Sequence, residues 1–305
     1  MPDDTRSLAR LISLIEDADP RVPELLRELP RSTKNPYVVG ITGAPGVGKS
    51  TTTSALIAHW RSVDARVAVL AVDPSSPFTG GALLGDRVRM QTHATDGGVF
   101  IRSMASRGHL GGLAAATPQA VRAVESAGFD IVLIETVGVG QAEVEIAATA
   151  DTTVVLVAPG MGDGVQAAKA GLLEVADVLV VNKADREGAD DALRDLRHML
   201  TYVTDRQPGE WRPPVVGAVA TAEGGVAELV EAIGKHRDWL ASSGEGERRR
   251  IARVATEIRA LALAMLTERL GLRADDPALR ELAGRVLAGQ LDVMTAAVTA
   301  TADRR

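Results

Sequence analysis

Residues 43–50 read Gly43-Ala44-Pro45-Gly46-Val47-Gly48-Lys49-Ser50, which fits the phosphate-binding pattern GxxxxGK[ST]. An apolar run, 37–41, precedes this stretch, and a helix-capable run, 50–60, follows it. In such a strand–loop–helix context the glycines let backbone N–H groups face phosphate oxygens, and the helix N-terminus adds a favourable dipole. Lys49 is expected to reach the β- and γ-phosphates, and the Ser50 hydroxyl to hold Mg²⁺. A glycine-rich turn without a ligand is the alternative, and these flanking segments argue against it.

Composition limits the class of protein. A chain of 305 residues can form one large α/β domain with helical extensions, or two modest domains. The net charge of −6 provides no basic field for nucleic acid, and the absence of cysteine excludes disulfides and thiolate metal sites. The N-terminus has no signal-like region, and no apolar run approaches the ~18 residues that span a bilayer. We therefore expect a cytoplasmic protein that binds neither membrane nor nucleic acid.

Strand-like and helix-like runs alternate from residue 37 onward. The strand-like runs are 37–42, 66–72, 99–102, 129–135, 153–158, 178–182 and 215–220. Several are continuous apolar stretches, as in strands whose two faces are both covered. This alternation predicts an α/β fold with a doubly wound, mostly parallel sheet, and a ligand crevice at the carboxyl ends of its strands.

The run 129–135 ends in Glu135, and Gly138 follows three residues later. An acidic residue after an apolar strand is the second signature of P-loop proteins, in which it orients Mg²⁺ or a water on the metal. Gly138 would let a backbone N–H approach the γ-phosphate. We expect Lys49, Glu135 and Gly138 to take part in catalysis.

Two further acidic residues follow the run 66–72. Asp73 comes directly after it, and Asp86 lies farther along a loop rich in proline, glycine and hydroxyl side chains. Both are candidate metal ligands, together with Ser50 and Glu135, because Mg²⁺ prefers oxygen ligands. For Asp73 a turn cap before the next proline is an open alternative. For Asp86 the alternative is a solvated position.

The run 178–182 ends in Asn182-Lys183-Ala184-Asp185, which matches NKxD. The Asp185 carboxylate can accept hydrogen bonds from the ring N–H and the exocyclic amine of guanine, which adenine does not offer. GTP is therefore the expected nucleotide. The residues expected to bind it are Gly43, Ala44, Pro45, Gly46, Val47, Gly48, Lys49, Ser50, Thr51, Asn182, Lys183, Asp185 and, near the base, Val219, Ala220 and Thr221.

The loop after the run 153–158 adds a third candidate moving segment. Asp163 can cap a helix whose first turns carry Gln166 and Lys169. This is locally an ordinary helix start. Its place at the same sheet edge as the phosphate loop favours a switch that senses the nucleotide.

The boundaries of the α/β part predict three regions: an N-terminal helical extension (1–36), a P-loop domain (37–243) and a C-terminal helical arm (244–305). Residues 242–246 are predicted to be a hinge. Beyond them, apolar residues recur at spacings of three and four, and a second helix is expected after Pro277; the recurring residues are Ile251, Val254, Ile258, Leu261 and Met265. A dimerisation arm is our first interpretation, with packing inside the chain as the alternative.

Together these motifs resemble the methylmalonyl-CoA mutase-associated GTPases, often called the MeaB or ArgK type. The stretches that carry the resemblance are GAPGVGKST, VDPSSPFTGGALLGDRVRM, ETVGVGQAE, PGMGDGVQAAKAG and NKAD. The family implies a homodimer joined through its C-terminal helices. It also implies slow GTP hydrolysis with Mg²⁺ that gates cofactor loading and protects an adenosylcobalamin-dependent acyl-CoA mutase, so that cobalamin is met only through the partner.

The resemblance also assigns roles to residues. It places Asp73, Asp86 and Glu135 around the metal, and Gln166 and Lys169 in a switch that couples the nucleotide state to the partner. Two other functions stay open: a metal-insertion GTPase of the same branch, and a small-molecule kinase. The first generally needs clusters of Cys or His, whereas this chain has no Cys and five His. For the second, the sequence offers no acceptor pocket with a candidate base.

Overall fold

The computed structural model describes residues 5–30, 35–74, 91–93, 95–106, 112–136, 142–160, 173–203, 209–222, 224–270 and 276–302. The chain divides into two compact units, Met1–Arg253 and Val254–Arg305. The first unit holds the strands β1 (Tyr37–Gly43), β2 (Val67–Pro74), β3 (Val99–Ser106), β4 (Ile131–Thr136), β5 (Thr152–Val157), β6 (Val178–Asn182) and β7 (Val215–Ala218). Its helices are α1 (Thr5–Glu16), α2 (Val22–Glu28), α3 (Lys49–Ser62), η1 (Gln91–His93), α4 (Gly112–Ser126), α5 (Ala142–Thr149), α7 (Leu173–Val175), α8 (Ala189–Val203) and α9 (Val226–Ser243).

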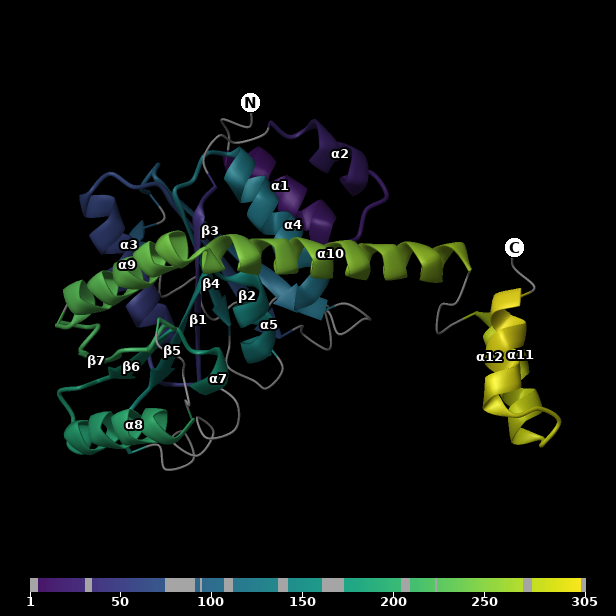
Figure 1. The fold of residues 1–305 in the computed structure, drawn as a ribbon. Coiled ribbons are helices and arrows are strands. Elements are labelled where there is room, and N and C mark those ends of the chain that lie inside the picture. Colours follow the sequence, from purple (N-terminus) through teal and green to yellow (C-terminus); the bar gives the residue numbers. More distant parts are fainter. Residues whose placement is uncertain are drawn as a thin grey trace. The chain divides into compact units, whose positions relative to one another are not determined.

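The described strands form one seven-stranded sheet in the order β3-β2-β4-β1-β5-β6-β7 (Figure 1). Every strand pair in it is parallel, which confirms the predicted doubly wound fold. β1 lies between β4 and β5, so the chain leaves it in the middle of the sheet. The loop after β1 therefore starts at the point where ligands bind in folds of this class.

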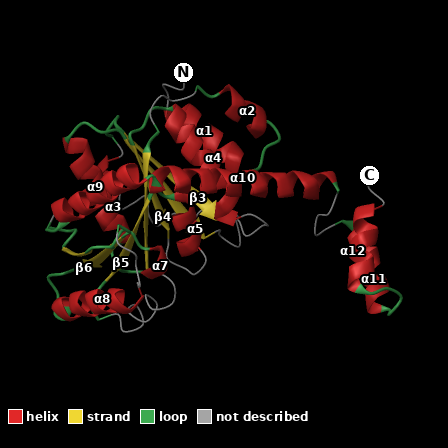
Figure 2. Ribbon diagram, viewed as in Figure 1, coloured by secondary structure: helices red, strands yellow, loops and turns green. Residues whose placement is uncertain are grey.

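Helices cover both faces of the sheet (Figure 2). Successive residues of a strand point to opposite faces. Thus Val39 packs in the cluster formed with α3 and α9, whereas Val38 packs with α1, α4 and α5. On the other half of that second face, Leu179 packs with α7 and α8. Coverage of both faces explains why the strands are almost wholly apolar in sequence.

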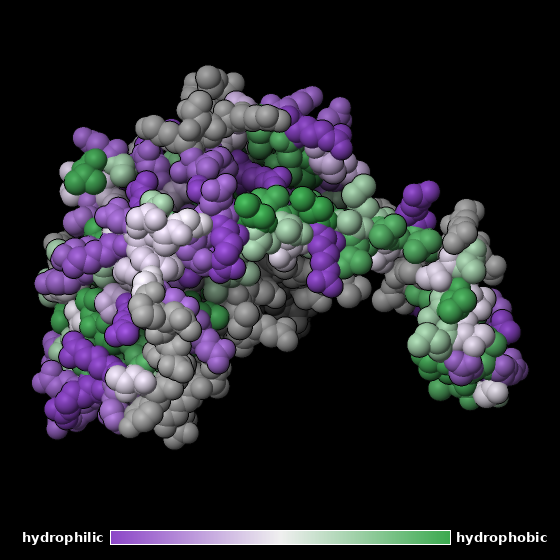
Figure 3. All heavy atoms as spheres, viewed as in Figure 1, coloured by the Kyte–Doolittle hydropathy of each residue, from purple (hydrophilic) through white to green (hydrophobic). Residues whose placement is uncertain are grey.

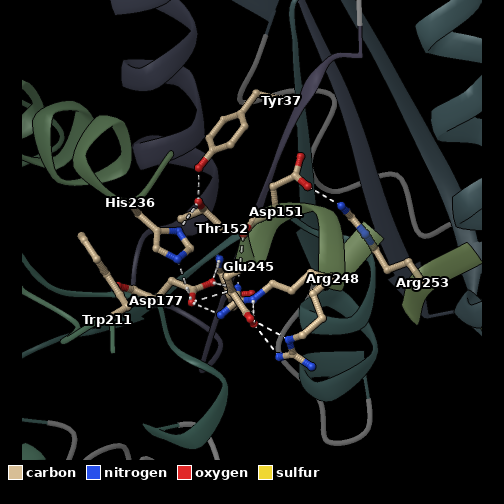
Figure 4. A network of polar contacts seen from close by, with 11 residues as sticks. Tyr37, Asp151, Thr152, Asp177, Trp211, His236, Glu245, Arg248 and Arg253 are labelled. Carbon is tan, nitrogen blue, oxygen red and sulfur yellow. Dashed lines mark hydrogen bonds and ion pairs between the residues drawn. The ribbon is translucent and has the colours of Figure 1, made fainter. Parts of the chain in front are cut away.

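The start of α10 (Glu245–Arg269) is held by carboxylates that precede two strands (Figure 4). Asp151 accepts from the N–H of Val38 at 2.9 Å and pairs with Arg253. Asp177 accepts from the N–H of Thr153 at 2.9 Å and pairs with Arg249 at 3.1 Å. Because the two arginines lie four residues apart, they share one face of the helix. Each carboxylate therefore joins the amino end of a strand to α10.

A buried imidazole completes this cluster. His236 Nδ1 lies 2.6 Å from Thr152 Oγ1, and its ring stacks on Trp239 and tilts against Trp211. Burial, followed by the nearby Arg249 charge, lowers the pKa of His236 from 6.5 to about 3. The folded state thus favours the neutral ring. This contribution to stability is complete above about pH 6.5 and is lost as the pH falls toward 3.

The residues 242–246, predicted to be a hinge, form a one-residue corner in the structure. α9 ends at Ser243 and α10 begins at Glu245, with Gly244 between them at φ 75°. Glu245 then pairs with Arg248 at 2.6 Å and with Arg249 at 3.2 Å. These pairs lie three and four residues apart, the spacing at which side chains on one face of a helix meet.

An Asp177→Ala variant is expected to lower the free energy of unfolding by about 3 kcal/mol, because it leaves Arg249 and a strand N–H without their buried acceptor. Denaturant-induced unfolding measures this loss. Asp191→Ala is the matched control, since that carboxylate pairs with Arg194 on an exposed surface. It should change the free energy by less than about 0.5 kcal/mol. Equal effects of the two substitutions would contradict a structural role for the cluster.

The second unit contains the rest of α10, followed by α11 (Pro277–Leu287) and α12 (Val293–Ala302). Asp276 caps α11 by accepting from the N–H of Ala278 at 2.9 Å. The helix expected after Pro277 is confirmed, whereas α12 was not predicted. None of the described helices of the chain is both long and apolar enough to cross a membrane.

Large apolar side chains lie exposed on these last three helices, and Figure 3 shows them as a green stretch along α10. Ile258 is 62% exposed and Met265 is 70% exposed. Apart from Val63, the exposed large apolar residues in the described part of the chain are Ile251, Val254, Ile258, Leu263, Met265, Leu266, Leu287, Val293, Met294 and Val298. Apolar exposure gathered in this way marks an interaction surface.

Candidate functional site

The phosphate loop joins β1 to α3, and two of its glycines are required by close packing. Gly43 has φ 142°, and a Cβ there would lie 2.2 Å from the carbonyl oxygen of Leu156. Gly48 has φ 98°, and a Cβ there would lie 2.3 Å from Nδ2 of Asn182. A larger residue at either position would displace backbone or a buried amide. The loop thus fits tightly against β5 and the end of β6.

Lys49 lies across this loop. Its side chain is only 7% exposed, and Nζ donates to the carbonyls of Gly43 at 2.7 Å and Ala44 at 3.0 Å. The N-cap of α3 is Gly48, so no cap side chain competes for the first N–H groups of the helix. An ammonium beside a helix N-terminus is a site for an anion such as a phosphate.

A carboxylate and two hydroxyls meet beside the loop. Glu135 is 2% exposed and pairs in register with Ile41, which brings the end of β4 next to β1. Ser50 Oγ donates to Glu135 Oε1 at 2.6 Å, and Thr53 Oγ1 lies 2.9 Å from Glu135 Oε2. Hydroxyl and carboxylate oxygens are hard donors of the kind that Mg²⁺ binds. The chemistry of Ser50 and Glu135 therefore fits the expected metal.

The NKxD residues contact the phosphate loop directly. Asn182 is 3% exposed and donates through Nδ2 to the carbonyl of Val47 at 2.8 Å. Lys183 Nζ donates to the carbonyl of Gly46 at 2.7 Å. Asp185 is exposed at the carboxyl edge of the sheet. Two members of this motif thus brace the phosphate loop, and the third remains accessible to a base.

The loop after β7 lies against the same motif. The N–H of Ala220 lies 3.4 Å from Asn182 Oδ1, and Val219 forms an isolated bridge with Gly224. Thr221 is exposed beside them. The structure therefore brings Val219, Ala220 and Thr221 near the NKxD motif, as the position of this loop predicted.

Several candidate residues lie outside the described part of the chain. They are Asp86, Gly138, Asp163, Gln166 and Lys169. For Asp73 the backbone is described within β2, at the carboxyl edge of the sheet, and the side chain is not. Thr51 is half-buried in the first turn of α3.

Thr53 is the site residue that the sequence analysis missed. It lies three positions after Ser50, so the two hydroxyls share one face of α3. That spacing was visible in the run Lys49-Ser50-Thr51-Thr52-Thr53-Ser54. The run could not show which of its hydroxyls faces a carboxylate 82 residues away in the chain.

The parallel sheet carries a lysine-bearing loop after its central strand, and an acidic residue ends the neighbouring strand β4. The NKxD segment packs against this loop. Together these features define a P-loop nucleotide hydrolase of the GTPase class. Comparison with known proteins identifies the family. Residues 8–274 match the description "Methylmalonyl Co-A mutase-associated GTPase MeaB". The chain belongs to this family and is a GTPase.

Several known proteins are similar to this chain over most of its length. A protein of Pyrococcus abyssi whose name places it among the GTPases is 47% identical over 96% of this chain and 91% of its own. GTPase ArgK of Escherichia coli is 38% identical over 78% of this chain and 74% of its own. Among solved structures, a LAO/AO transport system kinase superimposes with a TM-score of 0.70 at 28% identity, over 98% of this chain and 92% of that one.

Proposed function

We propose that this GTPase is a chaperone of an adenosylcobalamin-dependent acyl-CoA mutase, in which GTP hydrolysis gates cofactor loading and protects the mutase. The family match over residues 8–274 carries the proposal. A relative from Caenorhabditis elegans named "Methylmalonic aciduria type A homolog, mitochondrial" supports it, at 38% identity over 70% of this chain and 54% of its own. Methylmalonyl-CoA mutase is the partner that these names favour.

The chemistry assigned to the site follows from its contacts. Lys49 and the first N–H groups of α3 bind the β- and γ-phosphates, and Lys49 stabilises the charge that develops there in the transition state. Mg²⁺, when bound at Ser50 and Glu135, would neutralise phosphate charge. Asp185 accepts hydrogen bonds from the guanine edge. Asn182 and Lys183 hold the base-binding segment against the phosphate loop.

Intrinsic turnover is expected to be slow. A general base must have an oxygen or nitrogen available for the proton of the attacking water. We assign Glu135, which accepts from Ser50 and lies 2.9 Å from Thr53 Oγ1, to the metal side of the site and not to the proton of the water. Hydrolysis would therefore depend on groups that the partner orders.

The test of the proposal is GTPase activity of the purified protein with and without purified methylmalonyl-CoA mutase. We expect the mutase to accelerate phosphate release at least about tenfold, the effect of about 1.4 kcal/mol of added transition-state stabilisation. Gel filtration with GDP and with a non-hydrolysable GTP analogue should show complexes of different stability. A fast basal rate that no mutase changes would argue against a gated chaperone.

The metal-insertion alternative finds less support. In the described residues, no group of three or more His, Cys, Asp or Glu side chains is placed to hold a metal ion. Incubation with labelled GTP and amino acids tests the kinase alternative, since a GTPase yields only free phosphate.

We also propose that the chain forms a homodimer through its C-terminal helices. The exposed apolar residues of α10, α11 and α12 support this, because burying such surface against a partner removes it from water and is favourable. An Ile258→Lys/Met265→Lys double variant is expected to be monomeric in light scattering, since burying two ammonium groups at such an interface is costly. Arg259→Gln, on the exposed surface of the same helix, should stay dimeric. A dimeric double variant would place the interface elsewhere.

A further inference from the structure

Glu135 receives more than the single hydroxyl contact that the phosphate-loop motif provides. Ser50 donates to Oε1 at 2.6 Å, whereas Thr53 Oγ1 lies 2.9 Å from Oε2. Both hydroxyl residues are buried, as is the carboxylate between them. A buried carboxylate requires donors for its oxygens, and donors to a charged acceptor form the stronger hydrogen bonds. The second contact is therefore a candidate for a functional role.

The proton of Thr53 has two possible acceptors. The hydroxyl lies 3.0 Å from the carbonyl of Lys49 and 2.9 Å from Glu135 Oε2, and it can donate to one of them at a time. The carbonyl is neutral, whereas the carboxylate is charged and buried, so donation to Glu135 is favoured. In that state two hydroxyls of α3 hold the carboxylate, Ser50 at Oε1 and Thr53 at Oε2.

Holding Oε2 fixes the direction of Oε1. A carboxylate tied at one oxygen can rotate, whereas one tied at both has a single orientation. With Oε1 directed at Ser50, the Ser50 hydroxyl donates its proton to Glu135, and its oxygen can then act as a donor atom toward a cation. Removing an outer contact that orients a metal ligand in this way generally lowers metal affinity by about 10- to 100-fold.

We infer that Thr53 is a positioning residue for the metal side of the site, which acts by orienting Glu135 and through it Ser50. This inference rests on the Mg²⁺ site proposed above. The hydroxyl contributes no ligand itself. Its loss should weaken the retention of Mg²⁺ with the nucleotide and leave binding of the nucleotide without Mg²⁺ unchanged.

The chain provides a matched control in the preceding residue. Thr52 is also buried in α3, and its hydroxyl donates to the carbonyl of Gly48 at 3.1 Å. Thr52→Val and Thr53→Val remove the same group from the same helix turn. Of the two, Thr53→Val alone removes a donor from Glu135.

The experiment measures the release of fluorescent mant-GDP from the full-length protein across a range of Mg²⁺ concentrations, and kcat and KM for GTP. Thr53→Val should raise the Mg²⁺ concentration for half-maximal retention about tenfold. It should lower kcat at limiting Mg²⁺ while the Mg²⁺-free dissociation rate stays that of the wild type. Thr53→Ser should restore the wild-type dependence to within about twofold, since it keeps the hydroxyl. If Thr53→Val does not fold, Thr53→Ala removes the same donor.

The outcomes separate the two proposals. A wild type whose GDP release ignores Mg²⁺ would overturn the metal site, and the role of Thr53 with it. A wild type that responds to Mg²⁺, with Thr53→Val responding identically, would overturn the role of Thr53 alone. Equal shifts in Thr52→Val and Thr53→Val would also overturn it, because they would reflect a general disturbance of α3.

Discussion

A Lys49→Ala variant is expected to lose affinity for GDP and GTP by about hundredfold or more. Lys49 provides the ammonium of the phosphate loop, and removing a buried charge from such a contact generally costs several kcal/mol. Equilibrium titration with mant-GDP measures the loss. Because Nζ donates to two loop carbonyls in the structure, a modest fall in thermal stability should accompany it.

Lys235→Ala is the control for charge alone. Lys235 is exposed on α9 and pairs with Glu231 at 2.7 Å, so its removal should leave nucleotide binding unchanged. The chain contains few lysines, and this pair therefore separates the loop lysine from general electrostatics. If the Lys49→Ala variant bound GDP as tightly as the wild type, the assignment of 43–50 as the phosphate loop would be wrong.

An Asp185→Asn variant is expected to exchange guanine selectivity for xanthine selectivity. The carboxylate accepts from two donors of guanine, whereas an amide presents a donor of its own to the base edge and so suits the carbonyl of xanthine. A site that recognises its ligand through hydrogen bonds strongly disfavours a ligand that leaves its polar groups unpaired. We therefore expect GTP affinity to fall about hundredfold. Displacement of one fluorescent nucleotide by GTP and by XTP gives the ratio of the two affinities.

Asp190→Asn provides the comparison for Asp185→Asn. Asp190 is exposed in the first turn of α8, a few residues farther along the same chain segment. Its replacement should leave the GTP preference intact. If Asp185→Asn also kept a strict preference for GTP, the base would have to be read by other residues.

The sequence was sufficient to predict the sheet because each strand is a short apolar run with a turn signal at its end. The predicted run 178–182 coincides with β6, and the run 215–220 extends two residues past β7, which ends at Ala218. Candidate residues at strand ends, such as Glu135 and Asn182, can be located from the sequence for the same reason. Parallel strands bring their carboxyl ends to one edge whatever their separation in the chain.

Contacts between distant side chains could not be predicted in this way. The pairs Asp177–Arg249 and Asp151–Arg253 join residues with no motif around them. The composition of 242–246 predicts a hinge because it is that of a linker, whereas in the structure a single residue, Gly244 at φ 75°, separates α9 from α10. The composition of a short segment indicates how freely its backbone can move. It does not show which contacts the flanking helices make.

The contact between Asn182 and the phosphate loop has a consequence for altering nucleotide use. Asn182 Nδ2 occupies the space that a side chain on Gly48 would need, so the NKxD segment and the phosphate loop are packed against each other. Replacing Asn182 by a residue without an amide would leave the carbonyl of Val47 without this donor and a void beside Gly48. We therefore expect that Asp185 can be exchanged alone, whereas a change at Asn182 would also disturb the phosphate loop.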